Sequence, residues 1–326
     1  MAYLQIIGGL VLLVLAGDFL VRGAVSIAKH FGVPILVIGL TIVAFGTSAP
    51  ELVVAVDAVL VGVPALALGN VVGSNTANIL LVIGVPAILA PMSCNAPRLT
   101  RNLMIMLAAS AVFIGMAHSG QFRWIHGIIL LGFLASFLSY AFLRAKSHPN
   151  EIDPQEELEG IADIPDSMAF SALLVIAGII GLGFGADLLV DGAVIVAREW
   201  GISEEVIGLT LVAIGTSLPE LVTSVVAALR RHCDVAVGNV IGSNLFNLLG
   251  VIGVSSLFGS IPVAQSFLEI DLWVMLAASV ALLPFCHYQA SVGRLMGFLF
   301  LLSYIGYMVY LVQSGAVANA MEGILK

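Results

Sequence analysis

Apolar stretches of about 20 residues follow one another along the chain, with short breaks of charged residues, proline or glycine between them. A helix needs a stretch of that length to cross the ~30 Å hydrocarbon core of a bilayer. The composition agrees, because 60% of the residues are hydrophobic and only 10% are charged, whereas roughly 25% of the residues of a soluble domain are charged. The chain is therefore expected to be a polytopic helical membrane protein.

The breaks divide the chain into ten candidate spans, and the first is too long for the apolar region of a cleaved signal peptide. We therefore expect an all-α polytopic membrane protein with ten transmembrane helices. Their approximate ranges are 3–28, 33–60, 64–90, 101–118, 122–143, 168–197, 204–229, 234–258, 270–288 and 293–314.

One motif occurs twice in the chain. GLTIVAFGTSAPELV begins at Gly39 and GLTLVAIGTSLPELV begins at Gly208, and twelve of the fifteen positions are identical. The same offset of 169 residues relates GNVVGSNTAN, from Gly69, to GNVIGSNLFN, from Gly238. Since five spans is an odd number, the second half would enter the membrane from the opposite side. The sequence thus predicts two inverted-topology five-helix repeats, residues 1–143 and 168–326, joined by an acidic linker at 144–167.

Each copy contains G-T-S-x-P-E, which places a glutamate, Glu51 or Glu220, about midway along an apolar span. An ionised carboxylate at that depth is costly unless it faces water or a cation. The proline within the motif has no N–H for the carbonyl four residues back, so the neighbouring carbonyls of Thr47 and Thr216 are expected to be loosened as well. Transporters built from inverted repeats bind their substrates at the repeat interface, so the two glutamates are expected to share one site.

The second motif, G-N-x-x-G-S-N-x-x-N, adds uncharged oxygens on one helix face and glycines spaced for close helix packing. Calcium takes six to eight hard oxygen ligands, whereas zinc and copper prefer nitrogen and sulfur. The predicted site has oxygen donors only, and its two carboxylates balance one divalent ion. The ligands are the Glu51 and Glu220 carboxylates, the Thr47 and Thr216 carbonyls, and Ser48, Ser217, Ser74, Ser243, Asn78 and Asn247.

The distribution of basic residues predicts the orientation. Placing the N-terminus outside puts nine Lys and Arg residues at cytoplasmic ends and leaves three outside, as the positive-inside rule requires. Both termini are then outside and the acidic linker is cytoplasmic. The formal net charge of −8 makes nucleic acid an unsuitable partner. Asp18 and Arg22, one helical turn apart, are expected to form a local ion pair.

The two motif pairs closely resemble the alpha-repeats of the calcium/cation antiporter superfamily, in particular prokaryotic sodium/calcium exchangers. The resemblance implies a ten-helix inverted-repeat protein of the prokaryotic plasma membrane, with calcium on the two glutamates and two threonine carbonyls. It implies no cofactor and no obligatory protein partner, only the transported ions and the bilayer. It also implies that the first and sixth helices slide past the others. The implied sodium ligands are Ala44, Thr47, Ser48, Ser74, Asn78, Ala213, Thr216, Ser217, Ser243 and Asn247.

One residue departs from the family pattern. Well-studied sodium/calcium exchangers have an aspartate at the position of Asn247, so a calcium/proton antiporter with the same site stays open as an alternative. A passive cation channel would use the same oxygens, but paired buried glutamates on inverted repeats suit alternating access better. An intramembrane enzyme is disfavoured, since the sequence has neither H-E-x-x-H nor G-x-S-x-G.

Overall fold

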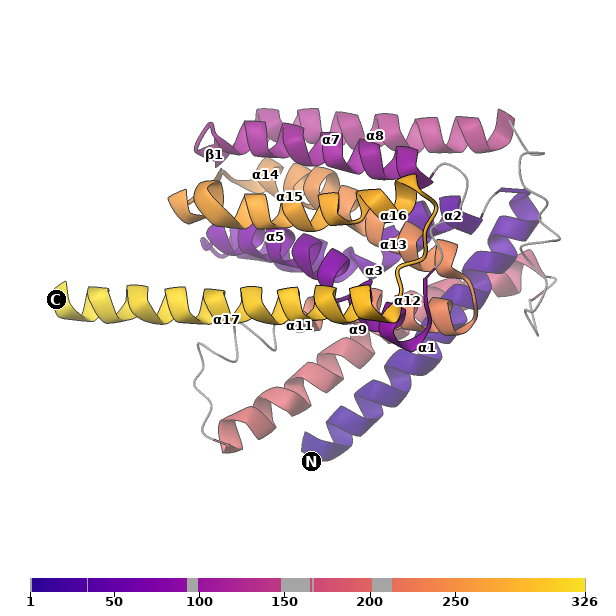
Figure 1. The fold of residues 1–326 in the computed structure, drawn as a ribbon, viewed down its shortest axis with the longest axis horizontal. Coiled ribbons are helices and arrows are strands. Elements are labelled where there is room, and N and C mark those ends of the chain that lie inside the picture. The colour runs from indigo at the N-terminus through magenta and orange to yellow at the C-terminus, as the bar shows by residue number, and fades with distance from the viewer. Residues whose placement is uncertain are drawn as a thin grey trace.

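The computed structural model describes residues 2–33, 35–92, 99–147, 165, 167–200 and 213–325 (Figure 1). Residues 1–143 contain α1 (Ala2–Phe31), α2 (Ile35–Ile38), the π-helix η1 (Gly39–Val43), α3 (Ala44–Thr47), α4 (Ala49–Leu60), α5 (Ala65–Leu80), α6 (Gly84–Leu89), α7 (Leu99–Ala117) and most of α8 (Trp124–Ser147). A two-residue strand, β1 (Gln121–Phe122), precedes α8.

The rest of the chain is also mainly helical. It contains α9 (Met168–Glu199), α11 (Ala213–Thr216), α12 (Leu218–Leu229), α13 (Cys233–Leu245), η5 (Phe246–Val251), α14 (Ile252–Phe258), η6 (Phe267–Asp271), α15 (Leu272–Ala281), α16 (Leu283–His287) and α17 (Arg294–Leu325). The strand β2 (Ile261–Pro262) pairs antiparallel with β1. Within the described residues the fold is otherwise helical, apart from a single bridge between Met92 and Val292.

Eight described helical segments are long and apolar enough to cross a membrane, and the bent α2–α4 segment makes a ninth. The remaining predicted span, 204–229, lies partly outside the described residues, which include the short helices α11 and α12 from Ala213 onward. The last predicted span, 293–314, agrees with the apolar span Arg294–Gln313, and the helix α17 continues beyond it to Leu325.

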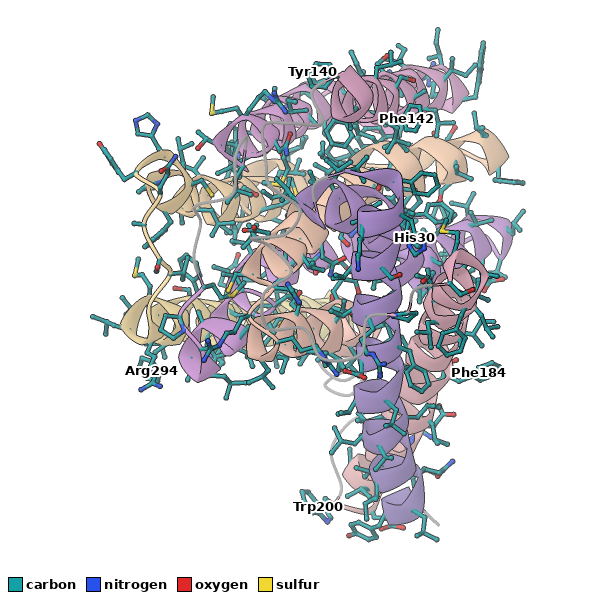
Figure 2. The ribbon with its side chains drawn as sticks, turned by 90° about the vertical axis from the view of Figure 1, so that its right-hand side faces the viewer. His30, Tyr140, Phe142, Phe184, Trp200 and Arg294 are labelled. Atoms are coloured by element: carbon teal, nitrogen blue, oxygen red, sulfur yellow. The ribbon has the colours of Figure 1, made fainter. Side chains whose placement is uncertain are left out.

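The helices α1 and α9 form a tilted antiparallel pair that projects from the rest of the bundle (Figures 1 and 2). Small residues recur every seven positions along their interface. A Cβ built at Gly9 would lie 2.8 Å from the carbonyl oxygen of Gly185, and one at Gly178 would lie 2.9 Å from that of Ala16. Only small residues permit such an approach, so the two helices pack backbone against backbone.

In the centre of the bundle, α5 and α13 are the most buried spans. The amide of Asn75 donates to the carbonyl oxygen of Asn244 at 3.2 Å, and the amide of Asn244 donates to the carbonyl oxygen of Asn75 at 3.3 Å. These two asparagines are 169 residues apart. The reciprocal bonds tie the two motif-bearing helices directly to each other.

The glycines of these two helices differ in what they contact. A Cβ at Gly242 would lie 2.5 Å from the carbonyl oxygen of Leu40, and one at Gly238 would lie 3.0 Å from that of Leu36. Close packing is thus confirmed for α13 against α2 and η1. For α5 the prediction is not tested, because positions 205 and 209, which correspond to Leu36 and Leu40, lie outside the described residues. Among the described atoms, a Cβ at Gly69 meets the ring of Phe267 at 3.7 Å and one at Gly73 meets none within 4 Å.

Candidate cation site

Both G-T-S-x-P-E motifs break a helix at their serine. Ser48 has φ −88° and ψ 8°, and Ser217 has φ −87° and ψ 1°, so each leaves helical geometry for one residue. The following proline lies in the first turn of α4 or α12, where its missing N–H costs nothing. The helix axis bends by 43° between α3 and α4. Each break places its glutamate in the first turn of the new helix, where the helix dipole favours a negative charge.

One group of predicted ligands comes together from both halves around Glu220. The Ser48 hydroxyl donates to Oε1 of Glu220 at 2.8 Å, and the Ser243 hydroxyl donates to the same oxygen at 3.4 Å. The Oγ1 of Thr47 lies 3.5 Å from the Oγ of Ser243. Four of the predicted residues therefore form a continuous hydrogen-bonded cluster, and two of them come from each copy of the repeat.

Two asparagines that the sequence analysis did not place in the site hold its threonines. The Thr47 hydroxyl donates to Oδ1 of Asn239 at 3.2 Å, and the Thr216 hydroxyl donates to Oδ1 of Asn70 at 3.4 Å. The pairs correspond under the 169-residue offset. A signal was present, since Asn70 and Asn239 are the second residues of the two G-N motifs. These contacts position the broken segments that carry the threonine carbonyls.

Seven oxygen atoms of the predicted ligands are buried without a hydrogen-bond partner among the described residues. They are both carboxylate oxygens of Glu51, Oε2 of Glu220, Oγ of Ser74 and Ser217, and Oδ1 of Asn78 and Asn247. Buried polar atoms in native proteins are almost always paired, and an exception calls for a water or an ion. The two glutamates are fully buried and close enough for their charges to repel. The arrangement is suited to a cation.

The remaining predicted residues are placed as follows. The Asn78 amide donates to Oδ1 of Asn244 at 3.0 Å, which leaves its own oxygen free to act as a ligand. Asn247 is buried, with neither polar side-chain atom bonded to a described residue. Ala44 is buried, and its carbonyl accepts from Ser48 N at 3.0 Å. Ala213 begins α11, so its backbone precedes the second break.

No basic side chain among the described residues forms an ion pair with either glutamate. The expected Asp18–Arg22 pair is confirmed at 3.8 Å, and Asp18 also pairs with Arg230 at the end of α12. Within the same part of the chain, no three His, Cys, Asp or Glu residues group as a metal site. The candidate site therefore consists of two carboxylates and uncharged oxygens.

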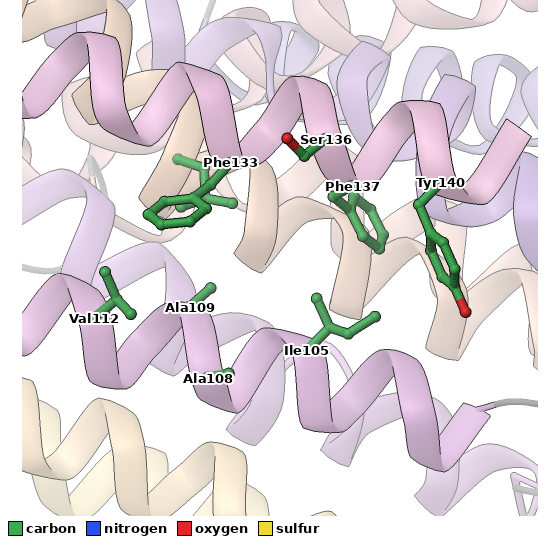
Figure 3. Close-up of a pocket in the computed structure, with 9 residues that line it drawn as sticks. Ile105, Ala108, Ala109, Val112, Phe133, Ser136, Phe137 and Tyr140 are labelled. Atoms are coloured by element: carbon green, nitrogen blue, oxygen red, sulfur yellow. The ribbon is translucent and has the colours of Figure 1, made fainter.

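A cavity of about 430 Å³ lies elsewhere, between α7 and α8 (Figure 3). Its lining is apolar except for the hydroxyls of Ser136 and Tyr140. Ser136 already donates to the Gly132 carbonyl of its own helix at 2.7 Å. The cavity offers a cation no carboxylate, so its size does not make it the functional site.

The comparisons with known proteins agree with this geometry. A family model described as "Sodium/calcium exchanger protein" matches residues 1–143 and 170–313. The chain belongs to the sodium/calcium exchanger family. It is similar to an uncharacterized membrane protein of Methanocaldococcus jannaschii, with 38% identity over 91% of this chain and 93% of that one. It is 33% identical to the sodium/calcium exchanger MaX1 of Methanosarcina acetivorans, over 95% of this chain and 98% of that protein.

A solved structure is also similar. The sodium-calcium exchanger NCX_Mj superposes with a TM-score of 0.80 at 36% identity, over 94% of this chain and 97% of that chain. This member of the sodium/calcium exchanger family is therefore a membrane transporter and not an enzyme, as predicted. Its family transports Ca²⁺ and Na⁺.

Proposed function

We propose that this exchanger moves Ca²⁺ against Na⁺ by alternating access, with Ca²⁺ held between Glu51 and Glu220. The observation that carries the proposal is the pair of fully buried carboxylates, which together with Ser74, Ser217, Asn78 and Asn247 present seven oxygens without a described partner. Burying two negative charges with no basic partner would cost several kcal/mol per ion, and one Ca²⁺ would offset both. Ser48, Ser74, Ser217, Ser243, Asn78, Asn247 and the carbonyls of Ala44, Thr47, Ala213 and Thr216 supply the other Ca²⁺ and Na⁺ ligands.

We also propose that the chain has ten spans in two inverted repeats, 1–143 and 168–326. Contacts that recur under the 169-residue offset support this arrangement. Thr47 bonds to Asn239 as Thr216 bonds to Asn70, and Asn75 and Asn244 bond reciprocally. A two-fold axis between the halves would generate each of these pairs from its counterpart.

We place the protein in a prokaryotic plasma membrane with both termini outside, as the distribution of basic residues indicates. A cysteine replacing Ser147 in a cysteine-free background tests the orientation. It should react with an impermeant maleimide only when the cytoplasmic face is open. Labelling of intact cells would contradict the proposed orientation.

The transport proposal is tested with Glu51→Gln and Glu220→Gln in proteoliposomes. Each should lower Na⁺-driven Ca²⁺ uptake roughly 100-fold or more, because breaking a buried ion pair costs about 3–5 kcal/mol. Asp57→Asn is the matched control, since Asp57 is on α4 but exposed. Undiminished uptake in either glutamine variant would overturn the site. Replacing the Na⁺ gradient with a proton gradient distinguishes the Ca²⁺/H⁺ alternative.

A further inference from the structure

A third buried carboxylate lies outside the site described above. Asp271 ends the π-helix η6 and is only 7% exposed, within the apolar segment Phe267–His287. The Tyr307 hydroxyl donates to its Oδ1 at 2.8 Å, and no described basic side chain pairs with it. Ionisable residues inside membrane spans are costly and usually face an ion path or a wet cavity. Single π-helical turns are also frequent at functional sites.

Asp271 faces a cavity that reaches the candidate cation site. The cavity has a volume of about 280 Å³ and lies between α5, η6 and α17. Ser74 and Thr216, both predicted ligands, line it together with Asp271. Ser74 is 2% exposed and its hydroxyl has no partner among the described residues. A single space therefore connects the third carboxylate to two residues of the site.

The corresponding position in the other half has no charge. Under the 169-residue offset Asp271 aligns with Asn102, which is buried in α7. The alignment is secure, because NLMIMLAAS from Asn102 and DLWVMLAAS from Asp271 agree at six of nine positions. If the halves are inverted, the two positions lie toward opposite faces of the membrane. The molecule thus has a carboxylate on one approach and an amide on the other.

We propose that the 280 Å³ cavity is the vestibule through which hydrated Ca²⁺ and Na⁺ reach the site from the outer face, and that the Asp271 carboxylate attracts these cations electrostatically. The assignment rests on the proposed transport function and on the proposed orientation with the N-terminus outside, in which the third span, beginning with α5, starts at the outer face. A carboxylate in a low-dielectric cleft raises the local concentration of cations. Since Asn102 has no charge, the effect acts on one face of the membrane only.

The first test is Asp271→Asn in oriented vesicles. The Ca²⁺ concentration that gives half-maximal uptake from the outer side should rise roughly three- to tenfold, while the value from the cytoplasmic side stays the same. Asp271→Glu should restore the outer value, and Asp57→Asn should not change it. A shift on both sides, or on neither, would overturn the proposal, because a merely structural aspartate has no preferred side.

The second test does not need transport. Gly73 lines the cavity, and no described atom lies within 4 Å of a Cβ built there. In a cysteine-free background, Gly73→Cys should react with cationic methanethiosulfonates faster than with anionic ones. Asp271→Asn should lower that ratio several-fold. Leu66→Cys, on the same cavity, serves if Gly73→Cys folds poorly.

The two tests separate the two proposals. An unchanged reagent ratio, or no reaction at either cysteine, would overturn the vestibule. A protein that moves no Ca²⁺ but shows the charge-dependent reaction would contradict the proposed function and retain the vestibule.

Discussion

Glu220 and Glu51 occupy equivalent places in two nearly identical motifs, but the structure surrounds them differently. Glu220 accepts hydrogen bonds from Ser48 and Ser243, whereas Ser74, the counterpart of Ser243, interacts with Glu51 without meeting hydrogen-bond geometry. The next helices along the chain, α5 after Glu51 and α13 after Glu220, also have different surroundings. The glycine face of α13 is packed against α2 and η1, while Gly69 and Gly73 of α5 line a cavity.

This comparison shows that equal sequences need not have equal surroundings. The proposed alternating-access mechanism also requires unequal halves, since the site then opens to one side at a time. Substitutions at corresponding positions should therefore have unequal effects.

The largest difference is expected between Gly242→Ala and Gly73→Ala. A methyl group at Gly242 would meet the Leu40 carbonyl oxygen and the Ala44 side chain. Overpacking of this kind should lower the free energy of unfolding by about 3 kcal/mol, whereas Gly73→Ala should leave it nearly unchanged. Thermal unfolding of the purified proteins in detergent measures both. Equal losses would show that the two faces are equally packed.

A smaller difference is expected between Asn78→Asp and Asn247→Asp. Asn244 donates its own amide to the Asn75 carbonyl, so its Oδ1 must accept from Asn78. An aspartate at 78 would set two acceptors against each other and should cost about 2 kcal/mol of stability. Asn247 makes no such bond among the described residues, so Asn247→Asp should fold normally and retain Ca²⁺ exchange. Loss of exchange in a stable Asn247→Asp protein would contradict its assignment as a tolerant ligand position.

The serines of the two breaks should differ by less. Ser48→Ala removes a hydrogen bond to a buried carboxylate oxygen and should lower the stability of the ion-free protein by about 1–2 kcal/mol. Ser217 has no partner among the described residues, so Ser217→Ala should be neutral without ions. With Ca²⁺ present, both variants should lose part of the stabilisation by the ion. Melting temperatures with chelator and with Ca²⁺ distinguish the two roles.

The smallest expected effect concerns pH. His232 lies between α12 and α13, where the first half has Val63. Burial, and next the charge of Arg230, lower the pKa of His232 below its ordinary value. The unfolded chain then binds the proton more readily, so the free energy of unfolding falls as the pH drops below about 6.5. His232→Val should flatten the melting temperature between about pH 7.5 and 5.5. An unchanged slope would mean that other groups cause the loss.

The sequence alone predicted the apolar spans, the 169-residue repeat and the types of ligand. Span length and motif identity are properties of the chain itself, because a bilayer requires about 20 apolar residues and a proline cannot continue the hydrogen bonding of a helix interior. The sequence also contained the correspondence between Asn102 and Asp271. Only the structure shows that the Asp271 carboxylate lines a cavity.

Only the tertiary structure decided which members of each pair are bonded. The Ser48–Glu220, Thr47–Asn239 and Asp18–Arg230 contacts join residues between 172 and 212 positions apart. Such contacts depend on how one helix is rotated and shifted against another, and no local pattern specifies that. Two nearly identical motifs give the same prediction, so the difference between Glu51 and Glu220 arises from packing, which places different neighbours around the two glutamates.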